Sequence, residues 1–522
     1  MFKNGNKNVV SNNRITNNKE YNKYKNNKKE GVKNTIIYGV GDASKEVIAD
    51  NHQLTREIKV YDDAIPIDID AQVALFFNQS DVVSIPNKVE YTLRRHLSKY
   101  LTHIHPDREV AKELCLLILS QLNSTNFDIL YGKNPDGWKR LKAKYLRNLV
   151  KLDGRAYKRI IEVLQIPTQK GQLLEVIKDD VEGLQCRRYR FGEAYRAKGI
   201  TTYQLKTSKA KKAYKSYQQR IVRDSLDNPI CKNLMQFYTE IEMPSIDVIQ
   251  REATKLIKED YRTRQGKLLK RLNKHSKKYF KDAEQFSFVE DSIAIYEYLT
   301  SNGLMVPHVS SEKNGGRVID SITLMPSWIR KLIKINGRKL VEGDYKCLHP
   351  NNAISLYGGK TEFLTHGHIA EYLQMDVLEV KRMHLSFFNK TTHQMKQSPL
   401  WKYYEAKEPQ MLQNLVDEKL KSEYKYRVTS RRLLEKEVAI MTDVIQRLND
   451  MDIYVGYVYD ALICCRKHQF MVEDVMNSVV LEHGVKTKAK TESTHNYIPF
   501  KERSSESAAV TQQKLTGELK RA

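Results

Sequence analysis

Cysteines are few in this sequence, and none has the spacing of a metal ligand. Only six occur among 522 residues, and no two form a CxxC pair or a zinc-binding pattern. They are Cys115, Cys186, Cys231, Cys347, Cys464 and Cys465. The sequence therefore excludes a disulfide scaffold and a zinc finger, and it favours a reducing compartment.

Long hydrophobic runs are also missing. The best apolar run, Leu114–Leu119, is far shorter than the ~18–20 residues that a membrane-spanning helix needs. Met1–Glu30 is rich in Asn and Lys and has no apolar signal core. We therefore expect no membrane partner and a cytoplasmic protein of a bacterial or phage-infected cell.

Acidic residues are too few to balance the basic ones. Lys and Arg total 88 against 63 Asp and Glu, which leaves a formal net charge of +25. Such an excess on an intracellular chain points first to nucleic acid as a partner. The alternative is that the surface charge serves solubility alone.

Composition and periodicity divide the chain into four parts. Residues 1–35 have the composition of a disordered basic tail, and residues 501–522 that of a loose C-terminal tail. Residues 36–240 show mixed, mostly helical patterns, and Pro244 marks a boundary before a third part that reaches residue 500.

Two basic stretches are candidates for contact with nucleic acid. In residues 206–223, Tyr214 and Tyr217 alternate with cations, and such rings can stack on bases or belong to an ordinary helix edge. Residues 251–281 hold twelve Lys or Arg against three acids on a strongly helical pattern. That helix predicts either a duplex-binding surface or a solvated face. The candidate contacts in it are Lys267, Lys270 and Arg271.

Two aspartates stand at the ends of predicted strands. Asp344 closes the run KLVEGDY, and Asp460 lies at a turn between two apolar strands in YVGYVYDALICC. A carboxylate among apolar strands is costly unless something compensates it, and a shared Mg²⁺ would do so. The alternative is two unrelated turn aspartates.

Between these aspartates lies a predicted basic helix. Leu378, Leu385 and Phe388 would keep one face apolar, while Lys381 and Arg382 lie on an adjoining one. A cation on such a helix can neutralise the charge that develops as pyrophosphate leaves a triphosphate. Taken alone, a basic pair on a helix is an ordinary surface feature.

Read together, residues 245–495 resemble the single-subunit polymerase superfamily, which joins DNA polymerase I-like enzymes and single-subunit phage RNA polymerases. The matching stretches are GGRVIDSITLMPSWIRKLIKINGRKLVEGDY, then Lys381 with Asn389 eight residues later, then RRLLEKEVAIMTDVIQRLNDMDIYVGYVYDALICC. The resemblance implies an α+β right-hand fold with an antiparallel palm sheet. It places a helical thumb at 241–285, the palm at 286–350 and 430–500, and small helical fingers at 351–429.

The resemblance also implies roles for individual residues. Asp344 and Asp460 would hold two Mg²⁺ ions, with Mn²⁺ as a possible substitute, and Lys381 would meet the triphosphate. Arg317 would grip the primer-template duplex. The residues expected near the incoming nucleotide are Arg382, Asn389, His349 and Tyr345.

The sequence departs from the family pattern at several of these places. Val377 stands where the family has an arginine, Asn389 where it has a tyrosine, and Tyr459 where it has a histidine. A degenerate palm in a nucleic-acid-binding replication initiator or defence protein is therefore one alternative function.

The expected function is template-dependent polymerisation of nucleoside triphosphates on a primer-template. His349 stands where DNA-making relatives carry a bulky residue that blocks the ribose 2′-hydroxyl, which favours a DNA polymerase. The Asn- and Lys-rich basic tail and the compact polymerase part would suit a phage or mobile element. An RNA polymerase of the same fold is the alternative, and His349 could instead be a core histidine. Asp68 and Asp70 are interpreted as strand-end or turn aspartates, and the later acids that an exonuclease site needs do not appear, so no proofreading is expected. The sequence has no GxxxxGK[ST] loop, which disfavours an ATP-driven helicase.

Overall fold

The computed structural model describes residues 67–493 except 78–80, 126–135, 153–155, 179–185, 197–198, 264, 273–281, 283, 301–302 and 311. These residues belong to one compact unit, Pro66–Ala522. The predicted tails, 1–35 and 501–522, lie outside the described residues. Within the described part, no helix is long and apolar enough to cross a membrane.

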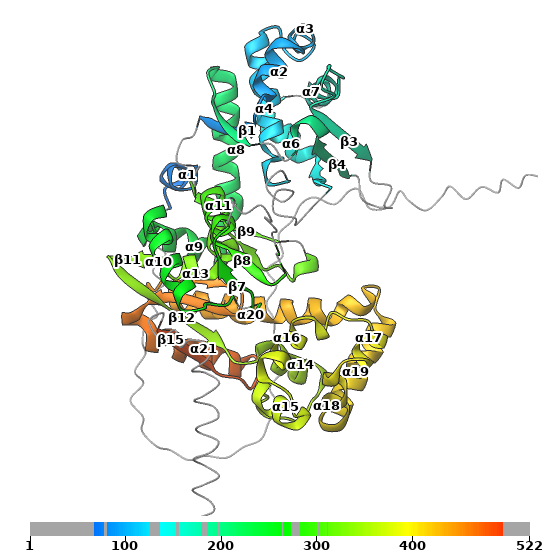
Figure 1. Ribbon diagram of the computed structural model, residues 1–522, viewed down its shortest axis with the longest axis vertical. Helices are drawn as coiled ribbons and strands as arrows, with labels where there is room; N and C mark the ends of the chain where they lie inside the picture. Colours follow the sequence, from blue (N-terminus) through cyan, green and yellow to red (C-terminus); the bar gives the residue numbers. More distant parts are fainter. Residues whose placement is uncertain are drawn as a thin grey trace, which may run out of the picture. The chain divides into compact units, whose positions relative to one another are not determined.

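An antiparallel sheet lies at the centre of the C-terminal half (Figure 1). Its strands follow the order β13 (Gly456–Val458), β14 (Ala461–Cys465), β12 (Arg338–Tyr345), β11 (Lys334–Ile335) and β6 (Ile241–Glu242). A further strand, β15 (Ala489–Ser493), also pairs with β12. The apolar residues of α20 (Val428–Asn449) and α21 (Gln469–Glu482) pack with this sheet in one core. The mixed α and β architecture with antiparallel sheets confirms the predicted fold class at this level.

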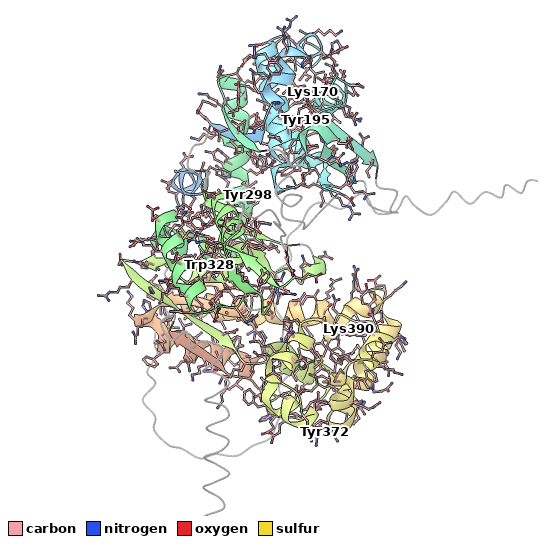
Figure 2. The ribbon with its side chains drawn as sticks, in the orientation of Figure 1. Lys170, Tyr195, Tyr298, Trp328, Tyr372 and Lys390 are labelled. Carbon is pink, nitrogen blue, oxygen red and sulfur yellow. The ribbon has the colours of Figure 1, made fainter. Side chains whose placement is uncertain are left out.

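The core around this sheet draws on a long stretch of the chain, from Val73 to Ala489. Trp328 is one of its buried aromatic residues (Figure 2). The core includes residues on both sides of Pro244, so the predicted boundary there does not separate two cores. The elements that contribute are α1 (Ile69–Phe77), α9 (Pro229–Glu240), α10 (Ile246–Lys258), β7 (Leu268–Lys270), α11 (Val289–Thr300), β10 (Val318–Ile319), α12 (Ser321–Leu324) and α13 (Ser327–Arg330). Two short strands, β8 (Phe286–Phe288) and β9 (His308–Val309), pair with β7 and β10.

A second core forms between residues 83 and 217, with Tyr195 buried in it (Figure 2). Its helices are α2 (Val89–Arg95), α3 (Ser98–Leu101), α4 (Arg108–Ser120), α6 (Ala143–Val150), α7 (Ala156–Leu164) and α8 (Ser208–Leu226). Two antiparallel sheets join them: β1 (Val82–Pro86) with β5 (Ile200–Gln204), and β2 (Lys139–Lys142), β4 (Cys186–Phe191) and β3 (Leu174–Lys178). The two cores meet within α8, because Tyr217 belongs to the second core and Val222 to the first.

A helical insert separates the strands that carry the two aspartates. It comprises α14 (Leu348–Tyr357), α15 (His366–Leu373), α16 (Val377–Phe387), α17 (Thr392–Lys396), α18 (Pro399–Lys407) and α19 (Pro409–Lys421). These helices bury a third core of their own, with a contribution from Leu433 at the start of α20. Lys346 and Cys347 alone separate β12 from the first helix of the insert.

The helix predicted over 251–281 is shorter than expected. Helix α10 ends at Lys258, and Asp260, with a φ of 50°, takes a left-handed backbone that ends the helical path. Leu268 and Leu269 then enter strand β7, which pairs in parallel with β8. Burial of these leucines in a strand outweighs the helical pattern of their neighbours, and residues 273–281 lie outside the described part.

The predicted apolar face of the 377–389 helix is confirmed at Phe388, which is buried in the third core, and wrong at the two leucines. Leu385 is 75% exposed and Leu378 is 44% exposed. The buried positions of α16 are Val380, His384 and Phe387, of which His384 donates to or accepts from Tyr404 Oη at 2.9 Å. A histidine with a buried partner therefore replaces a leucine on the inner face.

Candidate active site

Asp344 and Asp460 lie on neighbouring strands of the central sheet. In the antiparallel pairing of β12 with β14, Asp344 stands opposite Ala461, the residue after Asp460. The backbone N–H of Tyr345 donates to the carbonyl of Asp460 at 3.4 Å. Both aspartates are half-buried. Two residues that are more than a hundred positions apart are thus brought together at one end of the sheet.

The turn that presents Asp460 is a tight hairpin. Val458 pairs with Ala461, so Tyr459 and Asp460 alone form the loop. Tyr459 has a φ of 61°, the left-handed value that the first position of such a turn requires. The guanidinium of Arg317 lies over its ring, 4.4 Å from the centroid. This cation–π contact holds the turn against the segment that precedes β10.

A buried carboxylate, Glu437 on α20, joins two of the predicted site residues. Its Oε1 accepts a hydrogen bond of 2.7 Å from Arg317 Nε, and its Oε2 accepts one from Arg317 Nη2. The same Oε2 lies 2.7 Å from His349 Nε2 on α14. Burial would raise the pKa of Glu437, but the hydrogen bond from His349 and the charge of Arg317 outweigh it and hold the pKa below its ordinary value.

The surroundings of Asp460 favour the neutral form of its carboxyl, because the nearby cations do not offset burial and the charge of Glu437. Burial raises the pKa of its carboxyl and the charge of Glu437 raises it further, against the opposing effects of His349 and Arg317. A cation beside Asp460 would favour the charged form instead. Within the described residues, no group of three or more His, Cys, Asp or Glu could hold a metal. Two carboxylates nevertheless fit Mg²⁺, which binds one or two of them and completes its shell with water and substrate phosphates.

Lys381 projects from the exposed face of α16 together with Arg382. Burial, with a further effect of the charge of Lys381, lowers the pKa of His366 to about 4. The same charge acts on the thiol of Cys347, whose Sγ lies 2.8 Å from His366 Nδ1. Cys347 follows Asp344 by three positions, so the insert brings the Lys381 charge close to the end of β12.

Tyr345 and Asn389, both predicted to lie near the nucleotide, form hydrogen bonds with other parts of the chain. Tyr345 is 4% exposed, and its hydroxyl donates to the carbonyl of Met476 on α21 at 2.7 Å. Because side chains alternate along a strand, this side chain points to the opposite face from Asp344. Asn389 is exposed just beyond α16, and its Oδ1 accepts a hydrogen bond from Ser430 Oγ at 3.1 Å.

The three predicted duplex contacts lie at or next to strand β7 rather than on a helix. Lys270 Nζ is 4.0 Å from the centroid of the Phe286 ring. Arg271 Nη2 donates to the carbonyl of Gln250 at 3.3 Å and to Thr254 Oγ1 at 3.0 Å. Lys267 is half-buried just before the strand. Arg271 therefore ties this strand to α10, and the three predicted contacts do not lie on that helix.

Sequence reasoning missed Glu437, the residue that organises the cluster. A signal was present, because Glu437 falls between Leu433 and Met441 on the buried stripe of α20. An acid on such a stripe requires a charged or hydrogen-bonded partner. Asp68 and Asp70 belong to the start of helix α1 and not to a strand end or turn: Asp68 precedes the helix, its Oδ1 accepts from the backbone N–H groups of Asp70 and Ala71, and Asp70 lies in the first helical turn.

No known protein-family profile and no curated protein sequence matches this chain. Among solved structures, the chain is similar to the POL domain of Pol1 from M. smegmatis in a complex with DNA primer-template and dNTP. The two share 12% sequence identity with a TM-score of 0.35, over 54% of this chain and 72% of that one. We therefore argue function from the site residues themselves.

Proposed function

We propose that this protein is a template-dependent nucleotidyltransferase that polymerises nucleotides by two-metal phosphoryl transfer. The observation that carries the proposal is the placement of Asp344 and Asp460 side by side on β12 and at the β13–β14 turn. In this proposal the central sheet is the palm, the helical insert is the fingers, and residues 241–285 are the thumb.

The two aspartates are proposed as the metal ligands. Magnesium held there would activate a primer 3′-hydroxyl and stabilise the leaving pyrophosphate. The raised pKa of Asp460 supports the assignment, because a cation would favour the charged form of this carboxyl.

Cations from two other elements complete the proposed site. Lys381 and Arg382 would face the triphosphate from α16, and Asn389 would lie near its sugar. Arg317 would contact the primer-template through Nη1, the guanidinium nitrogen that its bonds to Glu437 do not use. Glu437 thereby fixes the direction of Arg317 before nucleic acid binds.

The proposed product is DNA. The hydrogen bond from His349 to Glu437 fixes an imidazole at the start of α14, five residues after Asp344, and leaves that side chain 34% exposed. A fixed, bulky ring at this place would crowd a ribose 2′-hydroxyl. An RNA polymerase of the same fold is the second candidate, and it requires the pocket beside His349 to admit that hydroxyl.

Replacement of the turn aspartate tests the proposed function. Asp460→Asn should lower primer extension about 10³-fold or more, since several kcal/mol of transition-state charge stabilisation are lost. It should also raise Tm in EDTA at neutral pH, because it removes a carboxylate whose pKa is raised in the folded state. Mg²⁺ should raise the Tm of the wild type and leave that of Asp460→Asn unchanged.

The matched control is Asp474→Asn, at an exposed position of α21. It should extend primers at the wild-type rate and keep the Mg²⁺ effect on Tm. Undiminished synthesis by Asp460→Asn would refute the assignment. A wild type that is inactive with both Mg²⁺ and Mn²⁺ would favour the degenerate palm of a binding protein.

The choice of sugar is tested at His349. Extension of one primer with deoxynucleotides and with ribonucleotides, side by side, should show a preference for deoxynucleotides. His349→Gly should relax this preference, whereas His349→Gln, which keeps bulk and a donor for Glu437, should retain most of it. Equal use of both nucleotide sets by the wild type would favour the RNA polymerase.

A further inference from the structure

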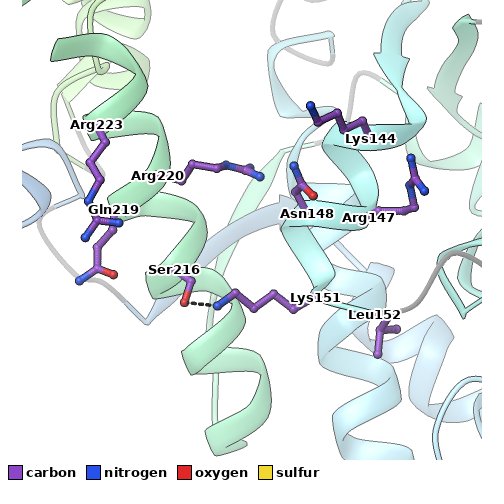
Figure 3. A pocket seen from close by; sticks show the side chains of 9 residues that line it. All are labelled: Lys144, Arg147, Asn148, Lys151, Leu152, Ser216, Gln219, Arg220 and Arg223. Atoms are coloured by element: carbon purple, nitrogen blue, oxygen red, sulfur yellow. Dashed lines mark hydrogen bonds between the residues drawn. The ribbon is translucent and has the colours of Figure 1, made fainter. Parts of the chain in front are cut away.

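A basic groove lies between α6 and α8, on elements of the second core (Figure 3). Its volume is about 760 Å³, and it carries none of the residues assigned to the candidate active site. The residues that line it are Lys144, Arg147, Asn148, Lys151, Leu152, Ser216, Gln219, Arg220 and Arg223.

Five of these nine residues are cations and none is an acid. Among the described residues, no carboxylate forms a salt bridge with Lys144, Arg147 or Arg220. Lys151 Nζ donates to a neutral partner, Ser216 Oγ, at 2.6 Å (Figure 3). These charges therefore repel one another across the groove, and an anion between them would remove that cost.

A nearby acid, Asp70, is already engaged. Asp70 lies outside the lining, and its Oδ1 accepts a hydrogen bond from Gln219 Nε2 at 3.0 Å. That bond and the charge of Lys215 lower the pKa of Asp70, with a smaller effect from Arg223. Asp70 thus acts on the groove at Arg223, while Arg220 lies over the ring of Tyr217, 5.6 Å from the centroid.

The cations form a row on each wall. Lys144, Arg147 and Lys151 recur at helical spacing along α6 and just beyond it, and Arg220 and Arg223 do so along α8. At 1.5 Å per residue, the row from 144 to 151 is about 10 Å long. A row of this length on both sides suits an anion with charges at intervals, rather than a single small ion.

The two helices that form the walls of the groove, α6 and α8, pack with their inner faces in the second core. Leu146 and Leu149 of α6 and Tyr217 of α8 are buried in the second core. Tyr145 Oη and Tyr217 Oη lie 2.7 Å apart, and the rings of Tyr214 and Tyr217 stack with an interplanar angle of 11°. Tyr217 is buried in the second core and Tyr214 is half-buried against it, and no aromatic residue is among the nine described residues that line the groove.

We propose that this groove binds consecutive backbone phosphates of single-stranded nucleic acid, without sequence preference, as a site separate from Asp344 and Asp460. Cations on both walls favour a single strand lying between them, because each wall can then reach the same chain of phosphates. The lining has no ring to stack on bases, which removes the usual basis for preferring one base. The inference does not depend on catalysis by the candidate active site.

Charge reversal in the full-length protein tests the inference. Arg147→Glu with Arg220→Glu should raise the Kd for a labelled single-stranded oligonucleotide about tenfold or more, measured by fluorescence anisotropy in EDTA without nucleotides. The slope of log Kd against log salt should fall by about 1.4, or about 0.7 for each of two lost phosphate contacts. Oligo-dT and oligo-dA should bind equally well.

The matched control is Arg95→Glu with Arg159→Glu, on exposed positions of α2 and α7 in the same core. It changes the net charge by the same amount and should leave Kd and slope close to wild type. Both double variants should keep the wild-type Tm, because all four arginines lie at the surface or in the open groove.

Three results would overturn the inference. Equal weakening by both double variants would show a general charge effect. Displacement of the strand by micromolar tripolyphosphate would show a site for small anions. Loss of duplex binding with unchanged single-strand binding would show a duplex site. Because the assay contains no metal or nucleotide, none of these outcomes depends on whether Asp460→Asn abolishes synthesis.

Discussion

Glu437 decides the charge balance of the candidate site. Its carboxylate is fully buried, yet it stays ionised because it accepts several hydrogen bonds. Arg317 donates to both of its oxygens, and His349 Nε2 lies 2.7 Å from Oε2. The charge that stabilises Arg317 and His349 also raises the pKa of Asp460. One residue thus orients two proposed contacts and prepares a carboxylate to accept a cation.

Glu437→Gln should cost about 3 kcal/mol of unfolding free energy at neutral pH, because it leaves Arg317 without its buried partner. The folded-state pKa of Glu437 lies below its ordinary value of 4.5. Its contribution is therefore present above that value and is lost as the pH falls through the lower, folded-state pKa. Urea unfolding at pH 7 and at acidic pH should show the difference between wild type and variant shrinking.

The same loss at both pH values would contradict the assigned charge state of Glu437. Leu433→Met, a volume-conserving change one turn earlier on the buried stripe of α20, is the packing control. Its cost should be small and independent of pH.

At the scale of elements, the turn before β10 is fitted to α20 by a glycine. Gly315 has a φ of 64°, and a Cβ there would lie 2.3 Å from Leu434 Cβ and 2.8 Å from Leu434 C. Gly337, in the β11–β12 hairpin, has a φ of 70° with nothing within 4 Å of a Cβ. Both glycines therefore have a left-handed backbone, but only at Gly315 would an added methyl group clash with a neighbour.

Gly315→Ala should destabilise the protein by about 3 kcal/mol, because the added methyl meets the backbone of α20 as well as a strained φ. It should also weaken primer extension, since the displaced turn carries Arg317. Gly337→Ala should cost only about 1 kcal/mol, from the backbone alone, with extension unchanged. Thermal unfolding and extension rates of both variants measure this, and equal costs would contradict the close fit to α20.

At the scale of the whole molecule, the proposed site needs two folded parts. The central sheet presents Asp344 and Asp460, whereas Lys381 comes from an insert with its own hydrophobic core. Cys347 connects them, because it lies between β12 and α14 in the chain. Burial raises the pKa of its thiol, and the nearby charge of Lys381 opposes that effect. Any motion of the insert would therefore change the distance between the proposed metal ligands and the triphosphate contact.

Lys381→Ala should raise the KM for nucleotides about tenfold or more with a smaller change in primer affinity, because the lost cation is proposed to meet the triphosphate. Steady-state extension at varied nucleotide and varied primer concentrations separates the two effects. Lys402→Ala, at an exposed position of α18, should leave both unchanged. An unchanged nucleotide KM in Lys381→Ala would place α16 in a different role.

The sequence by itself determined the features that local rules control. Asp107 accepts from the N–H groups of Glu109 and Val110 at the start of α4, as an N-cap should. The strand–turn–strand around Asp460 and the apolar stripe of α20 follow from alternation and helical period. The excess of positive charge was likewise visible before any fold was known.

Only the tertiary structure decided which of these residues meet. Arg317 and Glu437 are 120 positions apart, and the helices that line the basic groove, α6 and α8, are separated in sequence by α7 and strands β3, β4 and β5. Tyr345 lies beside Asp344 in sequence but faces α21. Periodicity assigns a residue to a face of its own element, whereas the partner of that face depends on how distant elements pack, which no local pattern encodes.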